Sequence, residues 1–466
     1  MDLRGRKVLV LGLGETGLSI ARWVAHEGGA VRVADTRAAP PALGSLRAAL
    51  PQAEILTGPF SDALLQGVAL VAASPGVPIA EPVVQAALSR GLEVVGDIEL
   101  FARFLAREPS ARSIAITGTN GKSTVTALAG SMCRAAGLDC EVAGNISPAA
   151  LTALLGRLQA RRLPEIWVLE LSSFQLETTR SLAADAATVL NVSADHLDRY
   201  PSIDAYAAAK ARVFERCKVQ VLNRDDGYSA AMRRPGERAV TFGLDPAPAH
   251  EDFGLLKVFG EHWLAMGGTP LVPVRELKLA GLHNAANALA ALALCRSVGL
   301  PLAPLIGALK GFAGLPHRVE RVSEIAGVQF YDDSKGTNVG STVAALAGLA
   351  RQMNGSGGKV VLIAGGQGKQ QDFAPLRAAV ADAARAVVLI GRDAPLIEAA
   401  IAGSGAEIAH ATSMAEAVAV AFDAARPGDI VLLSPACASF DMFRDYKERG
   451  DVFSATVREL AHARAR

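Results

Sequence analysis

Short apolar runs alternate with Ala- and Leu-rich stretches along almost the entire chain. The runs have the composition of buried strands, and the stretches between them have the residue types that favour helices. This alternation is typical of βαβ units, in which helices connect parallel strands. It therefore predicts an α/β protein.

The first series of apolar runs extends from Lys7 to about Leu105. A polar, proline-containing segment, Ala106–Ser113, follows it and is typical of a linker. The series predicts a Rossmann-like N-terminal domain over residues 1–107. Its predicted strands are KVLVLG, AVRVAD, AEILTG, ALVAAS and LEVVGD.

A second series begins with the strand SIAIT, which leads into the glycine-rich stretch GTNGKST and a helix from Ser123 to Ala136. Short strands separated by Gly and Pro over Arg234–Leu279 predict a small accessory β-sheet, and the segment Gly311–Pro316 marks a hinge. We therefore expect a central P-loop ATPase-type α/β domain over residues 108–314. Its other predicted elements are the strands IWVLEL, ATVLNVS and KVQVLN and the helix NAANALAALALCRSVG.

A third series starts near Arg321 with GVQFYDD and continues with KVVLIAGG, AVVLIG and DIVLLSP. It predicts a C-terminal Rossmann-like α/β domain over residues 315–466. Three domains agree with the length of the chain, because 466 residues exceed one ordinary domain.

Composition and charge narrow the class of protein. The 47 basic and 46 acidic side chains give a net charge of +1, so there is no electrostatic case for binding nucleic acid or an anionic membrane. No apolar run is long enough to predict a membrane span, and no signal-peptide pattern precedes the first strand. The five cysteines are scattered without metal-binding spacing. We therefore expect a cytoplasmic protein with reduced, buried thiols.

The turn after the first strand carries a phosphate-binding pattern. Gly12, Gly14 and Gly17 form G-x-G-x-x-G, and Asp35 ends the next apolar run. The same arrangement occurs in nicotinamide-dinucleotide sites, where the acidic residue holds a ribose. The pattern alone is weak evidence, so a dehydrogenase and a different nucleotide-binding role both stay open.

A second glycine-rich turn, GTNGKST, follows a strand and opens a helix. Backbone N–H groups at such a turn bind phosphate, and the helix dipole adds to the attraction. Lys122 can pair with the β- and γ-phosphates, and a hydroxyl of Ser123 or Thr124 can reach Mg²⁺. Only two residues separate Gly118 from Gly121, so the loop departs from the standard P-loop spacing. Its context nevertheless predicts a nucleoside triphosphate site.

A nucleotide with magnesium needs carboxylates nearby. Glu170 ends an apolar strand, where side chains enter the crevice at the carboxyl edge of a sheet. His196 also follows an apolar strand, and Lys210 lies in the helical stretch YAAAKARVF. By position alone, the histidine fits a structural role and the lysine fits a solvated helix surface.

Five segments together resemble the Mur ligase superfamily, whose members are ATP-dependent amino-acid-adding enzymes related to folylpolyglutamate synthetase. The segments are TGTNGKST, ELSSFQLE, NVSADHLDRY, GLHNAANALAAL and LPHRVE. Three others, SSFQL, DDSKGTN and SPACASFDMF, are similar to the member of the family that adds D-glutamate. The resemblance extends over essentially the whole chain and all three predicted domains.

The resemblance implies an ATP-dependent ligase that joins D-glutamate to UDP-N-acetylmuramoyl-L-alanine in peptidoglycan precursor synthesis. The acceptor carboxylate would attack the γ-phosphorus of ATP, giving ADP and an acyl phosphate, and the glutamate amine would then displace phosphate. This scheme needs no protein nucleophile, in agreement with the absence of a G-x-S-x-G or thiol motif from the sequence. The family also implies a monomer and two Mg²⁺ ions.

The resemblance assigns roles to residues of the central domain. Lys210 matches a lysine that CO₂ converts to a carbamate, which turns a cation into a carboxylate-like anion suited to magnesium. The four catalytic positions would be Lys122, Glu170, His196 and Lys210. The metal ligands would be Ser123, Glu170, His196 and the carbamate of Lys210. ATP would contact Gly118, Thr119, Asn120, Gly121, Lys122, Ser123, Thr124, Asn284, Asn287, Arg318 and Asp333.

The resemblance also implies sites for the two other substrates. Two positions depart from the family pattern: Tyr446 stands in place of a phenylalanine in the glutamate pocket, and Gln367 in place of an aspartate. The UDP-substrate would contact Glu15, Thr16, Gly17, Asp35, Thr36, Arg37, Ser74, Pro75, Gly76, Asn145, Ser172 and His196. D-glutamate would contact Lys335, Thr337, Lys369, Ser439, Phe440 and Tyr446.

Three alternatives explain less of the chain. A folylpolyglutamate synthetase has no comparable domain in front of its ATP loop. A nicotinamide-dependent dehydrogenase leaves four residues without a role: Lys122, Glu170, His196 and Lys210. A regulatory or transport ATPase with a P-loop needs no third domain carrying DDSKGTN.

Overall fold

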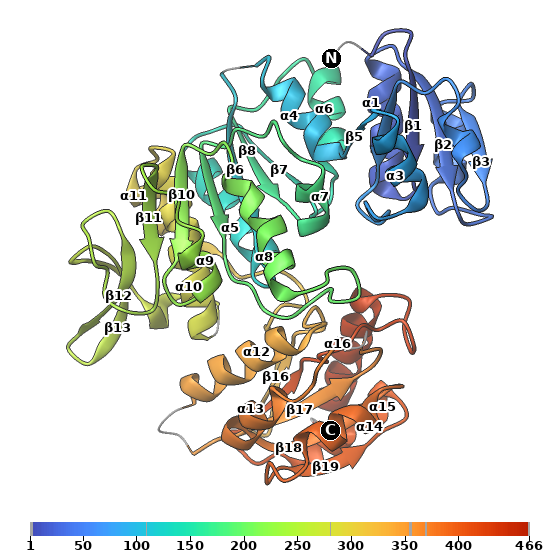
Figure 1. The fold of residues 1–466 in the computed structure, drawn as a ribbon. Coiled ribbons are helices and arrows are strands. Elements are labelled where there is room, and N and C mark those ends of the chain that lie inside the picture. Colours follow the sequence, from blue (N-terminus) through green and yellow to red (C-terminus); the bar gives the residue numbers. More distant parts are fainter. Residues whose placement is uncertain (1–2, 109, 280, 354–356, 369–370, 465–466) are drawn as a thin grey trace.

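The computed structural model describes residues 3–108, 110–279, 281–353, 357–368 and 371–464. Within them the chain forms three successive α/β units, built on sheets of five, nine and six strands. Figure 1 shows the central unit in contact with both of the others. The predicted three-domain α/β class is confirmed.

The first unit is a parallel sheet with the strand order β3-β2-β1-β4-β5. The order reverses at β1, so the turns after β1 and β4 flank a crevice at the carboxyl edge of the sheet. All five predicted strands are present: β1 (Lys7–Leu11), β2 (Ala30–Asp35), β3 (Glu54–Thr57), β4 (Leu70–Ala73) and β5 (Glu93–Val95). The helices are α1 (Glu15–His26), α2 (Leu43–Ala49), α3 (Pro82–Ser89) and α4 (Asp97–Leu105).

The central sheet has the order β14-β13-β12-β11-β10-β9-β6-β8-β7. The predicted accessory sheet is not separate: β12 joins β11 in parallel through the pair Phe242–Phe253, and β13 and β14 continue antiparallel. Its strands are β6 (Arg112–Thr117), β7 (Cys140–Gly144), β8 (Ile166–Glu170), β9 (Ala186–Val189), β10 (Val219–Asn223), β11 (Arg238–Phe242), β12 (Phe253–Val258), β13 (Glu261–Met266) and β14 (Thr269–Pro273). The helices are α5 (Lys122–Ala135), α6 (Ala150–Gln159), α7 (Ser173–Glu177), α8 (Ile203–Ala211), α9 (Gly227–Ala231), α10 (Leu282–Ser297) and α11 (Leu302–Gly311).

The third sheet has the order β15-β16-β20-β17-β18-β19, and its edge strand β15 is antiparallel to β16. Its strands are β15 (Glu320–Ile325), β16 (Val328–Asp332), β17 (Val360–Gly365), β18 (Ala384–Ile390), β19 (Glu407–His410) and β20 (Ile430–Leu433). The helices are α12 (Val339–Gln352), α13 (Leu376–Ala383), α14 (Ala394–Ile401), α15 (Met414–Ala424) and α16 (Tyr446–Arg464).

The units join in two different ways. Helix α4 packs the first unit onto the central one, since Phe101 meets Trp167 of β8 edge-on with ring centroids 4.9 Å apart. One cluster of buried apolar residues therefore runs through both units. The third unit instead has apolar clusters of its own. Its contacts with the active-site face of the central unit include the polar ones described below.

Among the described residues, no helix is both long enough and apolar enough to cross a lipid bilayer.

Candidate active site

The first glycine-rich turn, between β1 and α1, is braced by hydrogen bonds. A Cβ on Gly17 would lie 1.9 Å from the Gly12 carbonyl oxygen, so only glycine fits there. The Leu13 N–H donates to Asp35 Oδ2 at 2.7 Å, and the Ser74 hydroxyl donates to the Gly12 carbonyl at 2.9 Å. Hydrogen bonds from Arg37 lower the pKa of Asp35 to about 2. The acidic residue is thus an ion-paired brace of the turn.

A cavity of about 490 Å³ opens beside this turn. It lies at the crevice expected from the reversal of strand order. Ser172 and His196, which the sequence also assigned to the UDP-substrate, line a second cavity instead. The other predicted residues all line the first one: Glu15, Thr16, Gly17, Asp35, Thr36, Arg37, Ser74, Pro75, Gly76 and Asn145.

The second glycine-rich turn connects β6 to α5. Gly121 precedes the helix with a φ of 81°, and a Cβ there would lie 2.5 Å from Asn287 Oδ1. Asn191 fixes the turn from the segment after β9: its carbonyl oxygen accepts from the Thr119 N–H, and its Oδ1 accepts from the Asn120 N–H, both at 2.8 Å. The turn presents the N-terminus of a 14-residue helix, and such an arrangement suits the binding of phosphate.

Two lysines converge on this turn. Lys122 and Lys210 both donate to the Gly118 carbonyl oxygen at 2.9 Å. The Lys210 side chain is only 1% exposed and lies over the Tyr206 ring, 4.3 Å from its centroid. Burial, reinforced by the nearby charge of Lys122, holds the pKa of Lys210 well below its usual range. The ring face favours the ammonium form, whereas burial favours the neutral amine.

Glu170 ends β8 beside the same turn and is buried. Its Oε1 accepts from Asn145 Nδ2 at 2.9 Å. Its Oε2 is buried and has no hydrogen-bond partner among the residues that the structure describes. A buried carboxylate oxygen left unsatisfied in this way fits a cation ligand, and oxygen ligands suit Mg²⁺.

His196 lies in the loop after β9, with a left-handed φ of 54°. Its ring packs against Phe174 with centroids 4.8 Å apart, and its Nε2 lies 3.7 Å from Asp195 Oδ2. Ser123, the first hydroxyl of α5, accepts a hydrogen bond from Arg318 Nη2 at 2.7 Å. The third unit therefore reaches the hydroxyl that the sequence predicted as a magnesium ligand.

A cavity of about 900 Å³ brings these groups together between the central and third units. It shares Glu15, Asn145 and Ser147 with the first cavity, so the two adjoin. The predicted residue Gly118 does not line it. The predicted residues that do are Glu15, Thr119, Asn120, Gly121, Lys122, Ser123, Thr124, Asn145, Glu170, Ser172, His196, Lys210, Asn284, Asn287, Arg318, Asp333, Lys335, Thr337 and Tyr446.

The predicted glutamate pocket is only partly assembled in this cavity. Lys335 lies over the Tyr446 ring at 4.3 Å, and both line the cavity together with Thr337. Ser439 is buried and Phe440 is exposed, and neither lines it. Lys369 lies outside the described residues. Gln367, the other departure from the family pattern, pairs its backbone with Ala438, which ties the two loops together.

Asp333 is a buried carboxyl on the third-unit side of the cavity. The Ser434 hydroxyl donates to its Oδ2 at 2.7 Å. Burial raises the pKa of Asp333 to about 7, although Ser434 and the charge of Arg318 both oppose that shift. The cavity therefore contains a carboxyl that can exchange a proton near neutral pH.

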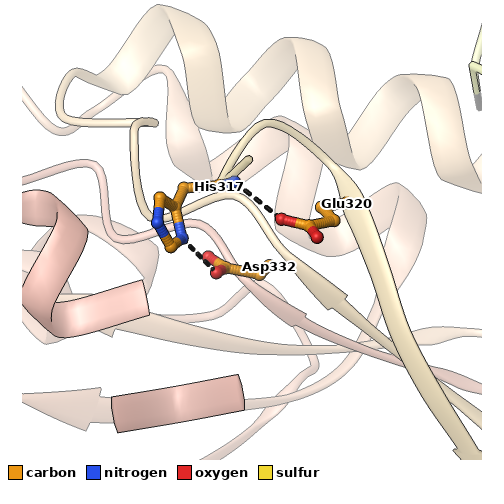
Figure 2. A group of neighbouring side chains, drawn as sticks. All are labelled: His317, Glu320 and Asp332. Atoms are coloured by element: carbon orange, nitrogen blue, oxygen red, sulfur yellow. Dashed lines mark hydrogen bonds and ion pairs between the residues drawn. The ribbon is translucent and has the colours of Figure 1, made fainter. Parts of the chain in front are cut away.

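A group of possible metal ligands outside this cavity is satisfied internally. Figure 2 shows His317, Glu320 and Asp332 at the start of the third unit. The His317 ring Nδ1 lies 2.7 Å from Asp332 Oδ2, and Glu320 Oε2 accepts from the His317 backbone N–H at 2.9 Å. The hydrogen bond to Asp332 raises the pKa of His317. These contacts brace the linker between the units, and we assign no ion to them.

Several site residues carried no recognised signal in the sequence. Arg199 donates to the Pro75 carbonyl oxygen at 2.7 Å and so ties the SPG turn of the first unit to the central one. Arg449, fully buried in α16, donates to the carbonyl oxygens of Ser334 and Cys437. Tyr206 lies four residues before Lys210 on one helix, and that spacing alone predicts their contact.

Comparison with known proteins accounts for this arrangement. Three family models match in order: the MurD-like N-terminal domain of Mur ligases over residues 6–96, the Mur ligase middle domain over 116–295, and the Mur ligase glutamate ligase domain over 317–437. A UDP-N-acetylmuramoylalanine–D-glutamate ligase of Nitrosospira multiformis is 55% identical, covering 100% of this chain and 98% of that protein. The chain belongs to the Mur ligase family.

Other Mur ligases agree with this assignment. A UDP-N-acetylmuramoylalanine–D-glutamate ligase of Thiobacillus denitrificans is 56% identical, again over 100% of this chain and 98% of that protein. The UDP-N-acetylmuramate–alanine ligase MurC of Thermotoga maritima has 20% identity and a TM-score of 0.61 over 97% of this chain and 99% of that chain. MurF of Acinetobacter baumannii has 16% identity and a TM-score of 0.60 over 99% of this chain and 91% of that chain. These two structures show the shared fold.

Membership of the Mur ligase family confirms the resemblance inferred from the sequence. The family match covers all three units. A dehydrogenase or a regulatory ATPase would not require the third unit. Those two alternatives are therefore not supported.

Proposed function

We propose that this Mur ligase joins D-glutamate to UDP-N-acetylmuramoyl-L-alanine and converts ATP to ADP and phosphate. One observation carries the proposal: the crevice beside the first turn and the two-lysine cavity adjoin through Glu15, Asn145 and Ser147. A substrate with a nucleotide at one end and a reactive carboxylate at the other can span both. The names of relatives about 55% identical support this choice of substrates.

The chemistry follows from the groups around the second turn. A carboxylate does not react with an amine at neutral pH until it has a leaving group. The acceptor carboxylate attacks the γ-phosphorus of ATP, ADP leaves, and the amine of glutamate then attacks the acyl carbon and expels phosphate. Lys122 and the N-terminus of α5 offset the charge that develops on the phosphoryl oxygens.

We propose that Glu170, Ser123, His196 and Lys210 hold two magnesium ions, Lys210 doing so as its carbamate. The unsatisfied Glu170 Oε2 supports a cation at this point. A bound divalent ion would withdraw charge from phosphate oxygens. The low pKa of Lys210 supports the carbamate, because only a neutral amine reacts with CO₂. Once carbamylated, Lys210 would exchange its repulsion with Lys122 for attraction.

We assign the remaining substrate contacts from the family resemblance, and the two cavities support those residues that line them. Asn284, Asn287, Arg318 and Asp333 would contact ATP, as would the turn itself. The residues around the first turn would hold the UDP end, where the N-terminus of α1 can receive a diphosphate. Ser172 and Asn145 would contact the muramoyl-alanine end. The glutamate dicarboxylate would meet Lys335, Thr337, Lys369, Ser439, Phe440 and Tyr446, two cations among them providing charge-assisted hydrogen bonds.

We further propose that the domains span residues 1–107, 108–314 and 315–466, that the protein acts as a monomer, and that it works in the cytoplasm. The third domain would close on the central one about the Gly311–Pro316 segment, which completes the cavity. The separate apolar clusters of the third unit support such a motion.

The test is ADP release measured with UDP-N-acetylmuramoyl-L-alanine and either D- or L-glutamate. We expect release only when the nucleotide substrate and D-glutamate are both present. Turnover that ignores both substrates would refute the ligase assignment. Turnover with a folate substrate in place of the nucleotide sugar would favour a folylpolyglutamate synthetase-like activity.

A further inference from the structure

Asn338 is a buried side chain with two separate sets of hydrogen bonds. It ends the segment Asp333–Asn338, which carries Lys335 and Thr337, and it directly precedes α12. Its Oδ1 accepts from the Ser341 N–H at 2.8 Å, as the capping residue of a helix does. This first set of contacts is local and explains how α12 begins.

The second set crosses from the third unit to the central one. Asn338 Nδ2 donates to Asn120 Oδ1 at 3.3 Å and to Asp195 Oδ2 at 3.1 Å. Asn120 lies within the second glycine-rich turn, and Asp195 directly precedes His196. One amide therefore contacts both the turn and the histidine loop.

The backbone around Asn338 is shaped for this approach. A Cβ on Gly340 would lie 2.8 Å from the Ser193 hydroxyl of the central unit. A larger residue there would push the start of α12 away from the turn. The close contact thus depends on a small residue on the third-unit side and a donor beside it.

Asp195 gives this contact its importance. The carboxylate of Asp195 lines the same cavity as Lys122 and Lys210, so it is a counter-charge to the lysine pair. Asn338 donates to Asp195 Oδ2, which lies 3.7 Å from His196 Nε2, and Asp195 Oδ1 accepts from the His196 backbone N–H at 3.0 Å. Its amide therefore holds the carboxylate beside the histidine, in the cavity that the two lysines also line.

We propose that Asn338 is a positioning residue that couples the glutamate-binding segment to the ATP turn. It holds the third unit against Asn120 and Asp195, which sets the distance from Lys335 and Thr337 to the acyl phosphate. The amine of glutamate then lies within reach of the acyl carbon. This role rests on the proposed ligase function. Asn338 lines the second cavity, and its position there would not by itself indicate what it does.

The variant Asn338→Asp separates the two sets of contacts. Its carboxylate still accepts from the Ser341 N–H, so α12 keeps its cap, but the donor to Asp195 becomes a repelling oxygen. Loss of a hydrogen bond to a charged group predicts a fall of about 10- to 100-fold in kcat/KM for D-glutamate. The control for a disturbance elsewhere in the third unit is Ser413→Ala, which removes the cap of α15 and should leave the kinetics unchanged.

Exchanging the amide and the carboxylate between positions 338 and 195 gives a stricter test. Asp195→Asn alone should also be impaired, because it removes the counter-charge. In the double variant Asn338→Asp with Asp195→Asn, the new amide donates to the new carboxylate and restores the contact. We expect the double variant to be at least about 5-fold more active than the product of the single effects. Additive effects, or wild-type kinetics in Asn338→Asp, would overturn the proposal.

A readout without substrates separates this proposal from the ligase assignment. Small-angle scattering of the full chain should give a larger radius of gyration for Asn338→Asp than for wild type and Ser413→Ala. If wild type fails to ligate D-glutamate and Asn338→Asp still has the larger radius of gyration, the interdomain contact is supported and the substrate assignment is refuted. If wild type ligates and Asn338→Asp matches it in both rate and dimensions, the role of Asn338 falls alone.

Discussion

The two glycine-rich turns of this chain resemble each other in sequence and differ in their surroundings. Around the first turn the charges are paired: Asp35 is held by Arg37 and by the Leu13 N–H. Around the second turn several charges are buried without full compensation. Burial holds the pKa of Lys210 well below its usual range, and Glu170 keeps an unsatisfied oxygen.

The difference teaches that conformity to a phosphate-loop pattern does not locate the chemistry. The first turn follows G-x-G-x-x-G, and its internally neutralised charges suit binding. The second turn departs from the standard spacing, and its uncompensated charges suit a transferring phosphoryl group and its cations. Free energy stored in desolvated groups at the second turn is released when ligands supply the missing partners.

The largest expected effect is at the second turn. Lys210→Ala should lower kcat by about 10³-fold or more, because the proposed carbamate and its metal site are lost. Short carboxylic acids such as formate should restore part of the rate by replacing the carbamate. The assay is ADP release with and without bicarbonate and the acids.

Lys218 offers the matched control for that substitution. Its side chain is 73% exposed and paired with Asp185, so Lys218→Ala should keep wild-type activity. Ligation by Lys210→Ala at a rate near that of wild type would contradict a catalytic role for Lys210, and with it the proposed difference between the two turns.

Gly17→Ala tests whether the first turn binds the nucleotide substrate without shaping the ATP site. The new methyl would overlap the Gly12 carbonyl oxygen, so the turn must shift. We expect KM for UDP-N-acetylmuramoyl-L-alanine to rise about 10- to 100-fold and stability to fall by about 1–3 kcal/mol. KM for ATP should stay within about 2-fold, as initial-rate kinetics can show.

The control for Gly17→Ala is Gly44→Ala in α2, where an added Cβ meets nothing within 4 Å. That substitution should be neutral or slightly stabilising, since alanine favours helices. An equal rise of both KM values in Gly17→Ala would mean that the first turn also shapes the ATP site.

Asp333→Asn tests the cost of buried charge at the second cavity. The pKa of Asp333 is raised to about 7 in the folded protein, so its contribution to stability is full below about pH 4 and is lost as pH rises through 7. The amide has no proton to lose. We therefore expect the variant to be more stable than wild type at pH 8, on the order of 1–3 kcal/mol, and similar at pH 4. Denaturant unfolding across this range measures the difference, and parallel pH profiles would contradict it.

The smallest effect is expected at the first turn. The pKa of Asp35 is lowered to about 2, so the stability from its pairing is present above about pH 4 and is lost as pH falls through 2. Because Arg37 is half exposed, Arg37→Ala should cost less than about 1 kcal/mol at pH 7. The difference from wild type should shrink towards pH 2 in the same unfolding measurement. A larger loss at pH 7 would show that the first turn also depends on buried charge.

Much of the fold was predictable because its strands are uniform apolar runs. KVLVLG and KVVLIAGG form strands buried on both faces, and such runs are visible without context. The strand β15, ERVSEI, was missed because it is an edge strand with polar and charged positions. The accessory strands are not a separate sheet, because one pair of phenylalanines joins β12 to β11. The hydropathy of the sequence does not reveal such a junction.

The site was predictable where motifs are local and not where contacts are distant. Lys122 and Ser123 follow from their place at a helix N-terminus. Asn338 and Asp195 are 143 residues apart in sequence, and no spacing rule links them. Arg449 is buried and donates to carbonyl oxygens of two loops, whereas the charged residues Lys447, Glu448 and Asp451 near it in sequence are typical of a solvated helix.

The extension of the central sheet has a consequence for the behaviour of the protein in solution. Without β12 to β14, the parallel strand β11 would end the sheet with exposed backbone donors and acceptors, which invite pairing with another chain. The outermost strand β14 instead carries Pro270 and Pro273, which have no N–H to offer. These two prolines leave gaps in the row of donors along the edge strand, which disfavours pairing with another chain at this end of the sheet.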